Sequence, residues 1–508
     1  MTTEARPHVR AEHSSVSEYL RQSLNPEELT SIGLLSFNQW TFAMGAMIDT
    51  GLAARELGSR VILGFWADET PLHDVGWDSS TTLSKLFGTQ TKDQRAEVGL
   101  RTLGLPPEAF AKPPIRQWRP IGLPSLPEPL TRARVRSLTY QGSDMGRAIL
   151  QVHPNFNTPI REDYVWPRRW VENAMKSYAW AYDQTIALIK EHKLGTVVVY
   201  NGRFTHDRAV AAAAEHAGVK VLNYDTGGYD TAFDLTPAHT HDWAHLQDRM
   251  KSMYSNWGDD RDDIGSSWFT NRQTHKDESL LLFVGAQTIG HLEQLPEAEQ
   301  LVVFFSSSGD EIAELDIDWA DYLQSQEAAL TALAAACRDR PGTKLVVRTH
   351  PHLRFKPADD LAGWLEAVAR AAPDAHIDPH SPVDSYTLMK RADIVFTYGS
   401  TAGIEAAFMG KPVVVMGPSA YDELGCVQRI KTAPEIPNFL MNPPTPNPTK
   451  AIPFGLMMQR RGFNYEHLDS PVSGEPLVGG VALDDASEIV RKIGHASVRL
   501  RTWWLTRK

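Results

Sequence analysis

Small hydroxyl residues, glycine and basic side chains follow three apolar runs in the second half of the chain. They form the segments Ser306-Ser307-Ser308-Gly309, Arg348-Thr349-His350-Pro351 and Gly399-Ser400-Thr401-Ala402-Gly403. At a strand-to-helix turn, small residues expose backbone N–H groups, which bind phosphate well. An imidazole or guanidinium from a neighbouring strand end would neutralise a phosphate leaving group. The residue types therefore predict a nucleotide or phosphate site.

Three charged side chains would complete this site. Arg348 and His350 would stabilise the leaving phosphate, and Glu405, one helical turn after Thr401, would accept hydrogen bonds from ribose hydroxyls. More ordinary roles are also open. Ser400 and Thr401 could form a helix N-cap. His350 could be a loop histidine and Glu405 a surface carboxylate. The prediction of a nucleotide site therefore rests on the occurrence of all these residues together at successive strand ends.

Motifs for other chemistries are absent or weak. The sequence lacks a P-loop, a G-x-G-x-x-G segment and an H-E-x-x-H segment. Asp316-Ile317-Asp318 could hold a metal–diphosphate pair, and His241 and His245 have the i, i+4 spacing of zinc ligands. An acidic stretch before a helix and a polar helix face are the ordinary alternatives. We expect neither a metal nor a cofactor.

The elements that position these residues alternate between strand and helix. In the second half, apolar strands are expected at 301–305, 344–348, 375–377, 393–397 and 412–416. In the first half they are expected at 31–37, 60–65, 196–200 and 219–223. Continuous apolar strands between helices are typical of parallel sheets covered on both faces, with ligands at the carboxyl ends of the strands. We therefore expect an α/β protein with two Rossmann-like doubly wound lobes and a cleft between them.

Composition sets the expected boundaries of these lobes. We expect a flexible arm over 1–28, a first lobe over 29–290 with an insertion at about 68–165, a second lobe over 300–425, a Pro-rich crossover over 426–480 and a basic helix over 481–508. The crossover contains seven prolines between Pro434 and Pro453, which argues against a helix or a central strand there.

Charge and hydropathy exclude several classes of protein. The net charge of -11 argues against general nucleic-acid binding, and two cysteines cannot build a disulfide framework. The sequence shows neither a secretory signal nor an apolar run of about 18 residues, so we expect a cytoplasmic protein. The last eighteen residues carry six basic side chains and Trp503-Trp504, which would suit peripheral membrane contact. Packing of this helix against the first lobe is the alternative.

Four motifs in the second half resemble a known family when taken in order. They are Arg348-x-His350-Pro351, Asp384-Ser385-Tyr386-x-Leu388, Gly399-Ser400-Thr401-x-Gly403-x-Glu405 and Gly410-Lys411-Pro412. They resemble the donor-binding half of GT-B glycosyltransferases, above all those of bacterial capsule and surface-polysaccharide synthesis. The donor-binding residues that the resemblance implies are Ser306, Ser307, Pro351, Tyr386, Ser400, Thr401, Gly403 and Glu405.

Weaker likenesses occur in the first half, at Tyr140-x-Gly142-x-Asp144-x-Gly146-Arg147, Asn201-Gly202-Arg203 and Asn223-Tyr224-Asp225-Thr226-Gly227-Gly228. An inverting transferase needs a general base that faces the acceptor. Asp225 is our choice, although it could be a turn residue before two glycines. Arg203, His206, Asp207 and Asp230 are further acceptor-side candidates, and a salt bridge is equally open for Arg203.

The resemblance implies a glycosyltransferase that moves a sugar from a nucleotide-sugar donor, such as CMP-Kdo, to a bacterial surface polysaccharide or glycolipid. It implies no essential metal, and the nucleotide-sugar would be a substrate rather than a cofactor. A nucleotide-sugar 2-epimerase and a teichoic-acid-type polyol-phosphate transferase are alternatives on the same fold. A sugar-nucleotide-binding scaffold protein is the non-enzymatic alternative.

Overall fold

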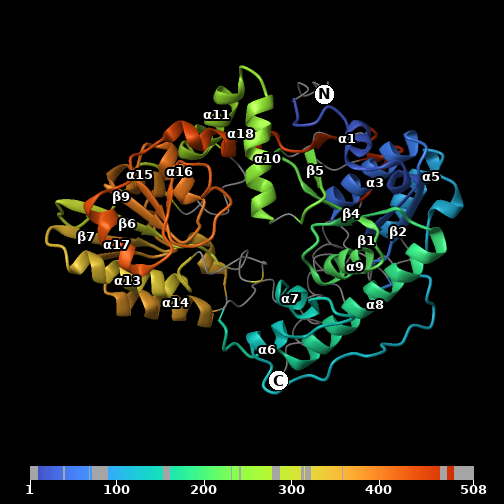
Figure 1. Cartoon of the computed structure of the whole chain (residues 1–508), viewed down its shortest axis with the longest axis horizontal. Helices are drawn as coiled ribbons and strands as arrows, with labels where there is room; N and C mark the ends of the chain where they lie inside the picture. Colours follow the sequence, from blue (N-terminus) through green and yellow to red (C-terminus); the bar gives the residue numbers. More distant parts are fainter. Residues whose placement is uncertain are drawn as a thin grey trace. The chain divides into compact units, whose positions relative to one another are not determined.

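The chain divides into two compact units in the computed structural model (Figure 1). The first unit comprises Met1–Thr240 and Arg460–Lys508, and the second comprises His241–Gln459. The structure describes residues 10–37, 40–67, 69–70, 90–152, 161–229, 232–239, 242–276, 287–309, 314, 322–356, 358–468 and 477–484.

The first unit contains a six-stranded sheet in the order β12-β5-β4-β3-β1-β2. Its strands are β1 (Ser31–Ser36), β2 (Arg60–Phe65), β3 (Thr196–Tyr200), β4 (Lys220–Thr226), β5 (Ala232–Thr236) and β12 (Phe463–Asn464). Strands β1 to β4 are parallel, whereas β5 and β12 are antiparallel to their neighbours. Because β2 and β3 lie on opposite sides of β1, the winding reverses between β1 and β3.

Helices cover both faces of this sheet, and each face has its own apolar core. One core contains residues of α7 (Met145–Leu150), α8 (Arg168–His192) and α9 (Thr205–His216). The other contains residues of α1 (Val16–Ser23), α3 (Thr41–Glu56) and α5 (Lys92–Thr102). The remaining elements are α2 (Pro26–Thr30), η1 (Pro107–Ala109), α6 (Arg132–Arg136) and the hairpin β13 (Leu477–Val478) to β14 (Val481–Ala482).

The second unit contains a parallel six-stranded sheet in the order β11-β10-β9-β6-β7-β8. Its strands are β6 (Gln300–Phe305), β7 (Thr343–Arg348), β8 (Ala375–Ile377), β9 (Ile394–Thr397), β10 (Val413–Val415) and β11 (Gln428–Arg429). The chain runs outward from β6 to β8 and then returns to β9 on the other side of β6. The winding therefore reverses between β6 and β9.

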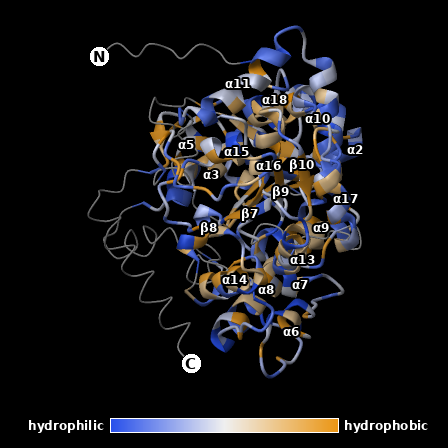
Figure 2. Cartoon of the chain, turned by 90° about the vertical axis from the view of Figure 1, so that its left-hand side faces the viewer, coloured by the Kyte–Doolittle hydropathy of each residue, from blue (hydrophilic) through white to orange (hydrophobic). Residues whose placement is uncertain are grey.

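Two apolar cores also cover this second sheet, whose strands β7, β9 and β10 are coloured as hydrophobic in Figure 2. The first core takes residues from α10 (Trp243–Asn256), α11 (Arg261–Gln273), α15 (Ser385–Arg391), α16 (Ala402–Phe408) and α18 (Ile452–Arg460). The second takes residues from α13 (Gln326–Arg338), α14 (Ala358–Ala371) and α17 (Ile436–Met441). Short 3₁₀ turns form η4 (Pro351–Phe355), η5 (Ala433–Glu435) and η6 (Pro448–Ala451). The prediction of two Rossmann-like α/β lobes is confirmed.

The boundary between the units differs from the expected one near 290–300. The chain passes into the second unit at residue 241, so α10 and α11 belong to the second lobe. Trp257, Trp268 and Phe269 lie in its core, and Phe269 stacks on Phe408 of α16 with ring centroids 4.2 Å apart. Each of the two helices buries only three residues, and this is why the sequence of the segment is mostly polar.

The Pro-rich stretch over 426–480 also differs from the expected crossover loop. It contains β11, α17 and α18, and the chain returns to the first unit only at Arg460. Pro437 and Pro453 occupy the first turns of α17 and α18, where a helix needs no backbone N–H donor. Helices were therefore compatible with these prolines.

The two chain ends also depart from expectation where they are described. Helix α1 buries Val16 and Leu20 completely, so residues 16–23 are not a flexible arm. Val481–Ala482 forms a strand rather than the start of a helix. The rest of the expected basic helix, from 485 onward, lies outside the described residues.

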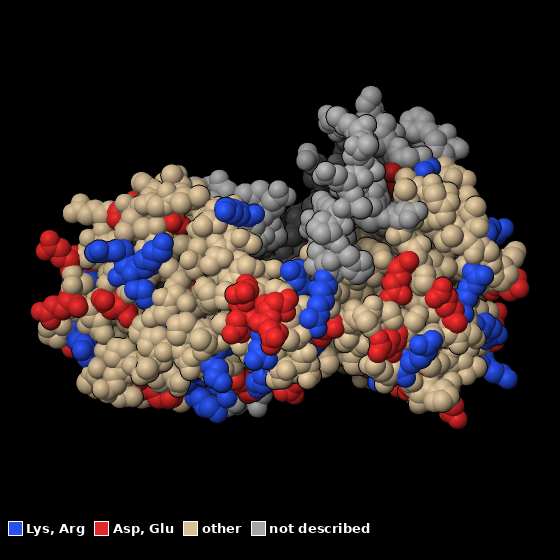
Figure 3. Space-filling model, turned by 90° about the horizontal axis from the view of Figure 1, so that it is seen from above, with Lys and Arg blue, Asp and Glu red and all other residues tan. Residues whose placement is uncertain are grey.

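Charges of both signs are mixed on the face shown in Figure 3, where Lys and Arg side chains lie among Asp and Glu side chains on both units. Such a mixture does not create the single-sign field that attracts polyanions to that face. Within the described residues, no helix is both long and apolar enough to cross a membrane.

Candidate functional site

The predicted donor-side segments meet at the point where the second sheet reverses its winding. Phe305 of β6 pairs with Arg348 of β7 on one side and with Thr397 of β9 on the other. The Thr397 hydroxyl donates to the carbonyl of Phe305 over 3.0 Å and accepts from the backbone N–H of Ser400 over 3.1 Å. Thr397 therefore ties the turn after β9 to the end of β6.

The loops after β6 and β7 are joined by one hydrogen bond. The Ser306 hydroxyl accepts from the backbone N–H of His350 over 2.8 Å. The His350 Nδ1 atom accepts from the backbone N–H of His352 over 3.2 Å, so the neutral ring carries its proton on Nε2. The backbone N–H of Ser307 donates to the Gln326 side chain. The loop geometry thus makes His350 Nε2 a hydrogen-bond donor.

Arg348 lies inside the lobe, with 1% of its surface exposed. Its Nη1 atom donates to the carbonyl of Asp378 over 2.5 Å, whereas Nε and Nη2 have no partner among the described residues. Burial lowers the pKa of Arg348 to about 10, and the nearby Asp378 and Glu293 charges partly oppose this shift. For Arg348 to contact a leaving phosphate directly, as the sequence predicted, its buried Nε and Nη2 atoms would have to become accessible.

The turn after β9 is held in shape by close packing. Gly399 has a φ of 80°, and a Cβ atom there would lie 2.0 Å from the carbonyl oxygen of Pro418. The buried Tyr421 hydroxyl donates to the carbonyl of Ser400. The Ser400 hydroxyl accepts from the N–H of Ala402 over 3.3 Å, whereas the Thr401 side chain is exposed and forms no capping bond. The N-cap alternative therefore describes Ser400 but not Thr401.

Glu405 is a buried carboxylate rather than a surface one, with 6% of its surface exposed. Its Oε1 atom accepts from Arg272 Nε over 2.5 Å and from the Tyr386 hydroxyl over 3.0 Å. Burial, together with the Glu405 charge, raises the pKa of Tyr386. Tyr386 and Glu405, both predicted on the donor side, are therefore in direct contact. Gly403 lies between them and the turn, and a Cβ atom there would lie 2.4 Å from the Tyr421 hydroxyl.

In the first unit, two acceptor-side candidates lie at the carboxyl ends of strands, Arg203 after β3 and Asp225 near the end of β4. Asn201 has a φ of 53°, and its amide donates to Asp225 Oδ2 over 2.5 Å and accepts from Arg203 Nε over 2.9 Å. The backbone N–H of Thr226 donates to Asp225 Oδ1 over 2.7 Å. Asp207 is buried in the first turn of α9, and Asp230 lies outside the described residues. Asn201 is the residue that links Arg203 to Asp225.

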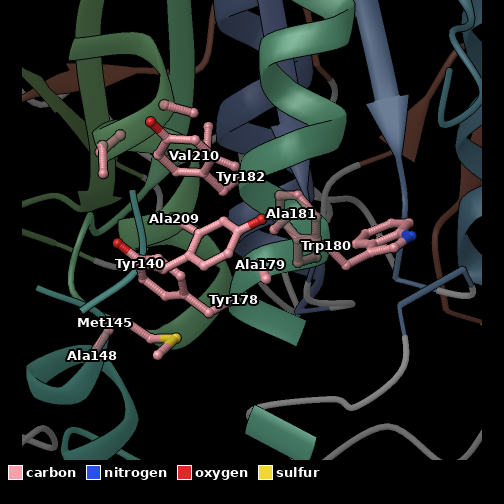
Figure 4. Packing of buried hydrophobic residues seen from close by; sticks show 14 of the residues in the cluster. Tyr140, Met145, Ala148, Tyr178, Ala179, Trp180, Ala181, Tyr182, Ala209 and Val210 are labelled. Carbon is pink, nitrogen blue, oxygen red and sulfur yellow. The ribbon is translucent and has the colours of Figure 1, made fainter. Parts of the chain in front are cut away.

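His206 and the motif around Tyr140 have structural partners. The His206 ring stacks on Phe37, with centroids 5.1 Å apart, and contacts the Thr70 hydroxyl. Tyr140 lies in the core shown in Figure 4, beside Tyr178 and Tyr182, and its hydroxyl donates to Asp183 over 3.0 Å. Asp144 pairs with Arg208 over 2.9 Å. The Asp144–Arg208 pair ties the start of α7 to α9, and the Tyr140–Asp183 bond ties the segment before α7 to α8.

Most residues of the two metal alternatives lie outside the described part of the chain. No group of three His, Cys, Asp or Glu side chains there could hold a metal ion. Asp316, Asp318 and His241 lie outside the described residues, and His245 is in the first turn of α10.

Three residues of this site were not found from the sequence. Gln326 and Tyr421 act through backbone groups of the loops, and Arg272 reaches Glu405 across 133 residues of sequence. Sequence spacing carries no information about contacts of these kinds.

The second lobe matches a known family. Residues 317–440 match the family model described as Capsule polysaccharide biosynthesis protein. The predicted resemblance is confirmed. The matched stretch lies in the second lobe and includes His350, Ser400 and Glu405. No curated protein matches the chain.

Several solved structures are distantly similar to this chain. A KpsC β-Kdo 2,4-transferase of Thermosulfurimonas dismutans is 15% identical over 56% of this chain and 84% of that chain, with a TM-score of 0.37. A putative UDP-N-acetylglucosamine 2-epimerase of Listeria monocytogenes is 11% identical over 89% and 93%, with a TM-score of 0.26. The glycotransferase of kitacinnamycin is 12% identical over 92% and 98%, with a TM-score of 0.26. Likenesses this distant carry no argument about function.

Proposed function

We propose that this chain is a capsule-type GT-B glycosyltransferase that moves a sugar from a nucleotide-sugar donor to a glycan or glycolipid acceptor. One observation carries the proposal: the loops after β6, β7 and β9 are joined through Ser306, His350 and Thr397 where the parallel sheet reverses its winding. Nucleotides bind at such switch points in open α/β sheets. The family match of residues 317–440 supports the same lobe as the donor side.

In the proposed reaction, the bond between the anomeric carbon and the donor phosphate oxygen breaks, and the acceptor oxygen bonds to that carbon. The electron pair of the broken bond stays on the phosphate. His350 Nε2–H and the turn at Ser400 and Thr401 donate hydrogen bonds to this phosphate as its charge develops. Arg348 supports the loop from inside through Asp378.

The acceptor hydroxyl loses its proton to Asp225 in this proposal. Asn201 and the N–H of Thr226 hold the two carboxylate oxygens, which fixes their direction. A CMP-activated sugar such as CMP-Kdo is the donor we favour, because the His-Pro and Ser-Thr motifs resemble those that contact the nucleotide phosphate in CMP-sugar transferases.

Incubation with candidate nucleotide-sugars, with and without a glycan acceptor, tests the proposal. We expect nucleotide release and a new glycosidic product only when the acceptor is present. Asp225→Asn should abolish transfer, whereas Glu108→Gln, which changes an exposed acid of the same lobe, should not. Conversion of the donor to a 2-epimer without acceptor would instead identify an epimerase.

A further inference from the structure

A buried charge pair connects a helix outside the family match to the predicted ribose site. Arg272 lies in the last turn of α11, and its Nε atom is 2.5 Å from Glu405 Oε1 on α16. The two side chains are 13% and 8% exposed. The Tyr386 hydroxyl donates to the same oxygen over 3.0 Å.

Arg272 is held rigidly in this position. Its guanidinium lies over the Trp268 ring, 4.4 Å from the ring centroid. Phe269 stacks on Phe408, which fixes α11 against α16. A planar cation over an indole loses little freedom when it binds a carboxylate, so the position of Glu405 depends on α11.

Both hydrogen-bond donors bind the same carboxylate oxygen of Glu405. Oε1 receives Arg272 and Tyr386, whereas Oε2 has no hydrogen-bond partner among the described residues. A buried carboxylate needs charged or polar partners that offset its loss of hydration. Arg272 supplies a charged partner at Oε1.

We infer that Arg272 is a positioning residue that holds the Glu405 carboxylate turned so that Oε2 accepts the ribose hydroxyls of the donor. The inference rests on the proposed function, because it assumes that a ribonucleotide binds at the turn after β9. If Arg272 has this role, the preference for a ribonucleotide over a 2′-deoxyribonucleotide depends on the contact between α11 and α16.

Calorimetric titration with CMP and 2′-deoxy-CMP, and with UDP and 2′-deoxy-UDP, tests this assignment. We expect the wild type to bind the ribonucleotide about tenfold or more tightly, since a hydrogen bond to a charged group is worth about that factor. Arg272→Gln should lower ribonucleotide affinity about tenfold and deoxynucleotide affinity much less, so that the ratio approaches one. Arg272→Lys, which keeps the charge, should restore part of the ratio.

Two further variants separate positioning from folding. Arg261→Gln removes another arginine of α11 that lies over an aromatic ring, at Tyr254, and should leave both affinities unchanged. Tyr386→Phe removes the second donor to Oε1 and should reduce the ratio even if Arg272→Gln does not fold. If Arg272→Gln leaves the ratio of ribonucleotide to deoxynucleotide affinity unchanged, whether or not both affinities fall, the inference is wrong. The proposal of a nucleotide site would still stand. Failure of the wild type to bind any nucleotide would overturn the proposed function and this inference with it.

Discussion

The predicted donor-side residues differ in how far the protein already uses their polar atoms. The Ser306 hydroxyl holds the backbone of His350, and Arg348 is buried against Asp378. The Thr401 side chain is exposed, and His350 is half-buried with Nε2 as a donor. In the proposed reaction, His350 and Thr401 contact the donor phosphate, whereas Ser306 and Arg348 hold the loops in place.

Replacing His350 by alanine tests its contact with the leaving phosphate. We expect His350→Ala to lower the rate of transfer about 10²–10³-fold, the effect of losing one hydrogen-bond donor to developing charge. The melting temperature should change little, because the side chain lies in a strand-end loop. His380→Ala changes an exposed histidine after β8 and should retain activity. A His350→Ala variant with nearly normal turnover would remove this residue from the site.

Asp49 gives the first unit a pH-dependent contact. Its buried carboxylate on α3 accepts from the backbone N–H groups of Glu466 and His467, and burial raises its pKa from 3.8 to about 6. The folded state therefore binds this proton more tightly than the unfolded state. The resulting stabilisation is complete below pH 3.8 and is lost as the pH rises through 6.

Asp49→Asn removes this titration. Relative to the wild type, the free energy of unfolding of the variant should rise by about 2 kcal/mol between pH 4 and pH 7. Urea unfolding at pH 4, 5, 6 and 7 measures this difference. The exposed Asp259→Asn should show a constant difference over the same range. A constant difference for Asp49→Asn as well would mean that Asp49 has an ordinary pKa in the folded protein.

At the scale of elements, the sequence predicted strands β1 to β4 and β6 to β10 but missed β5, β11 and β12. The expected strand at 393–397 is Ile394–Thr397, because a strand buried on both faces must be a continuous apolar run. Helices α17 and α18 were missed because their prolines were interpreted as interruptions rather than as first-turn residues. Arg272 could not be predicted, since its contact with Glu405 depends on how α11 packs on α16.

The turn from β9 to α16 depends on Gly399. Gly399→Ala combines a positive φ with a Cβ atom 2.0 Å from the carbonyl of Pro418, so we expect a loss of at least about 2 kcal/mol in the free energy of unfolding. Gly425 also has a positive φ, of 83°, but a Cβ atom there meets nothing within 4 Å. Gly425→Ala should therefore cost less, as measured by urea unfolding. Equal losses would show that the contact with Pro418 is unimportant.

At the scale of the whole molecule, the sequence predicted two lobes but placed their boundary about 50 residues too late. The error arose because α10 and α11 bury only three residues each, so that the sequence of this segment is polar. A boundary is defined by which core a helix joins, and Trp257 and Trp268 join the core of the second lobe.

A fragment that follows the observed boundary tests this assignment. Residues 241–459 contain both cores of the second unit, so we expect this fragment to melt cooperatively and to bind a nucleotide. Residues 300–459 lack α10 and α11 and would expose the surface that Trp268 and Phe269 cover. The shorter fragment should aggregate or melt without cooperativity. Equal behaviour of the two fragments in thermal melts would contradict the boundary at residue 241.

Nucleotide binding by the full chain tests the central claim most directly. Calorimetric titration with CMP, CDP, UDP and GDP should show that one of them binds at a single site. Replacing Ser400 and Thr401 together by alanine should weaken that binding about tenfold or more without lowering the melting temperature much. No binding by the wild type, or an unchanged affinity in the double variant, would contradict a donor site at the turn after β9.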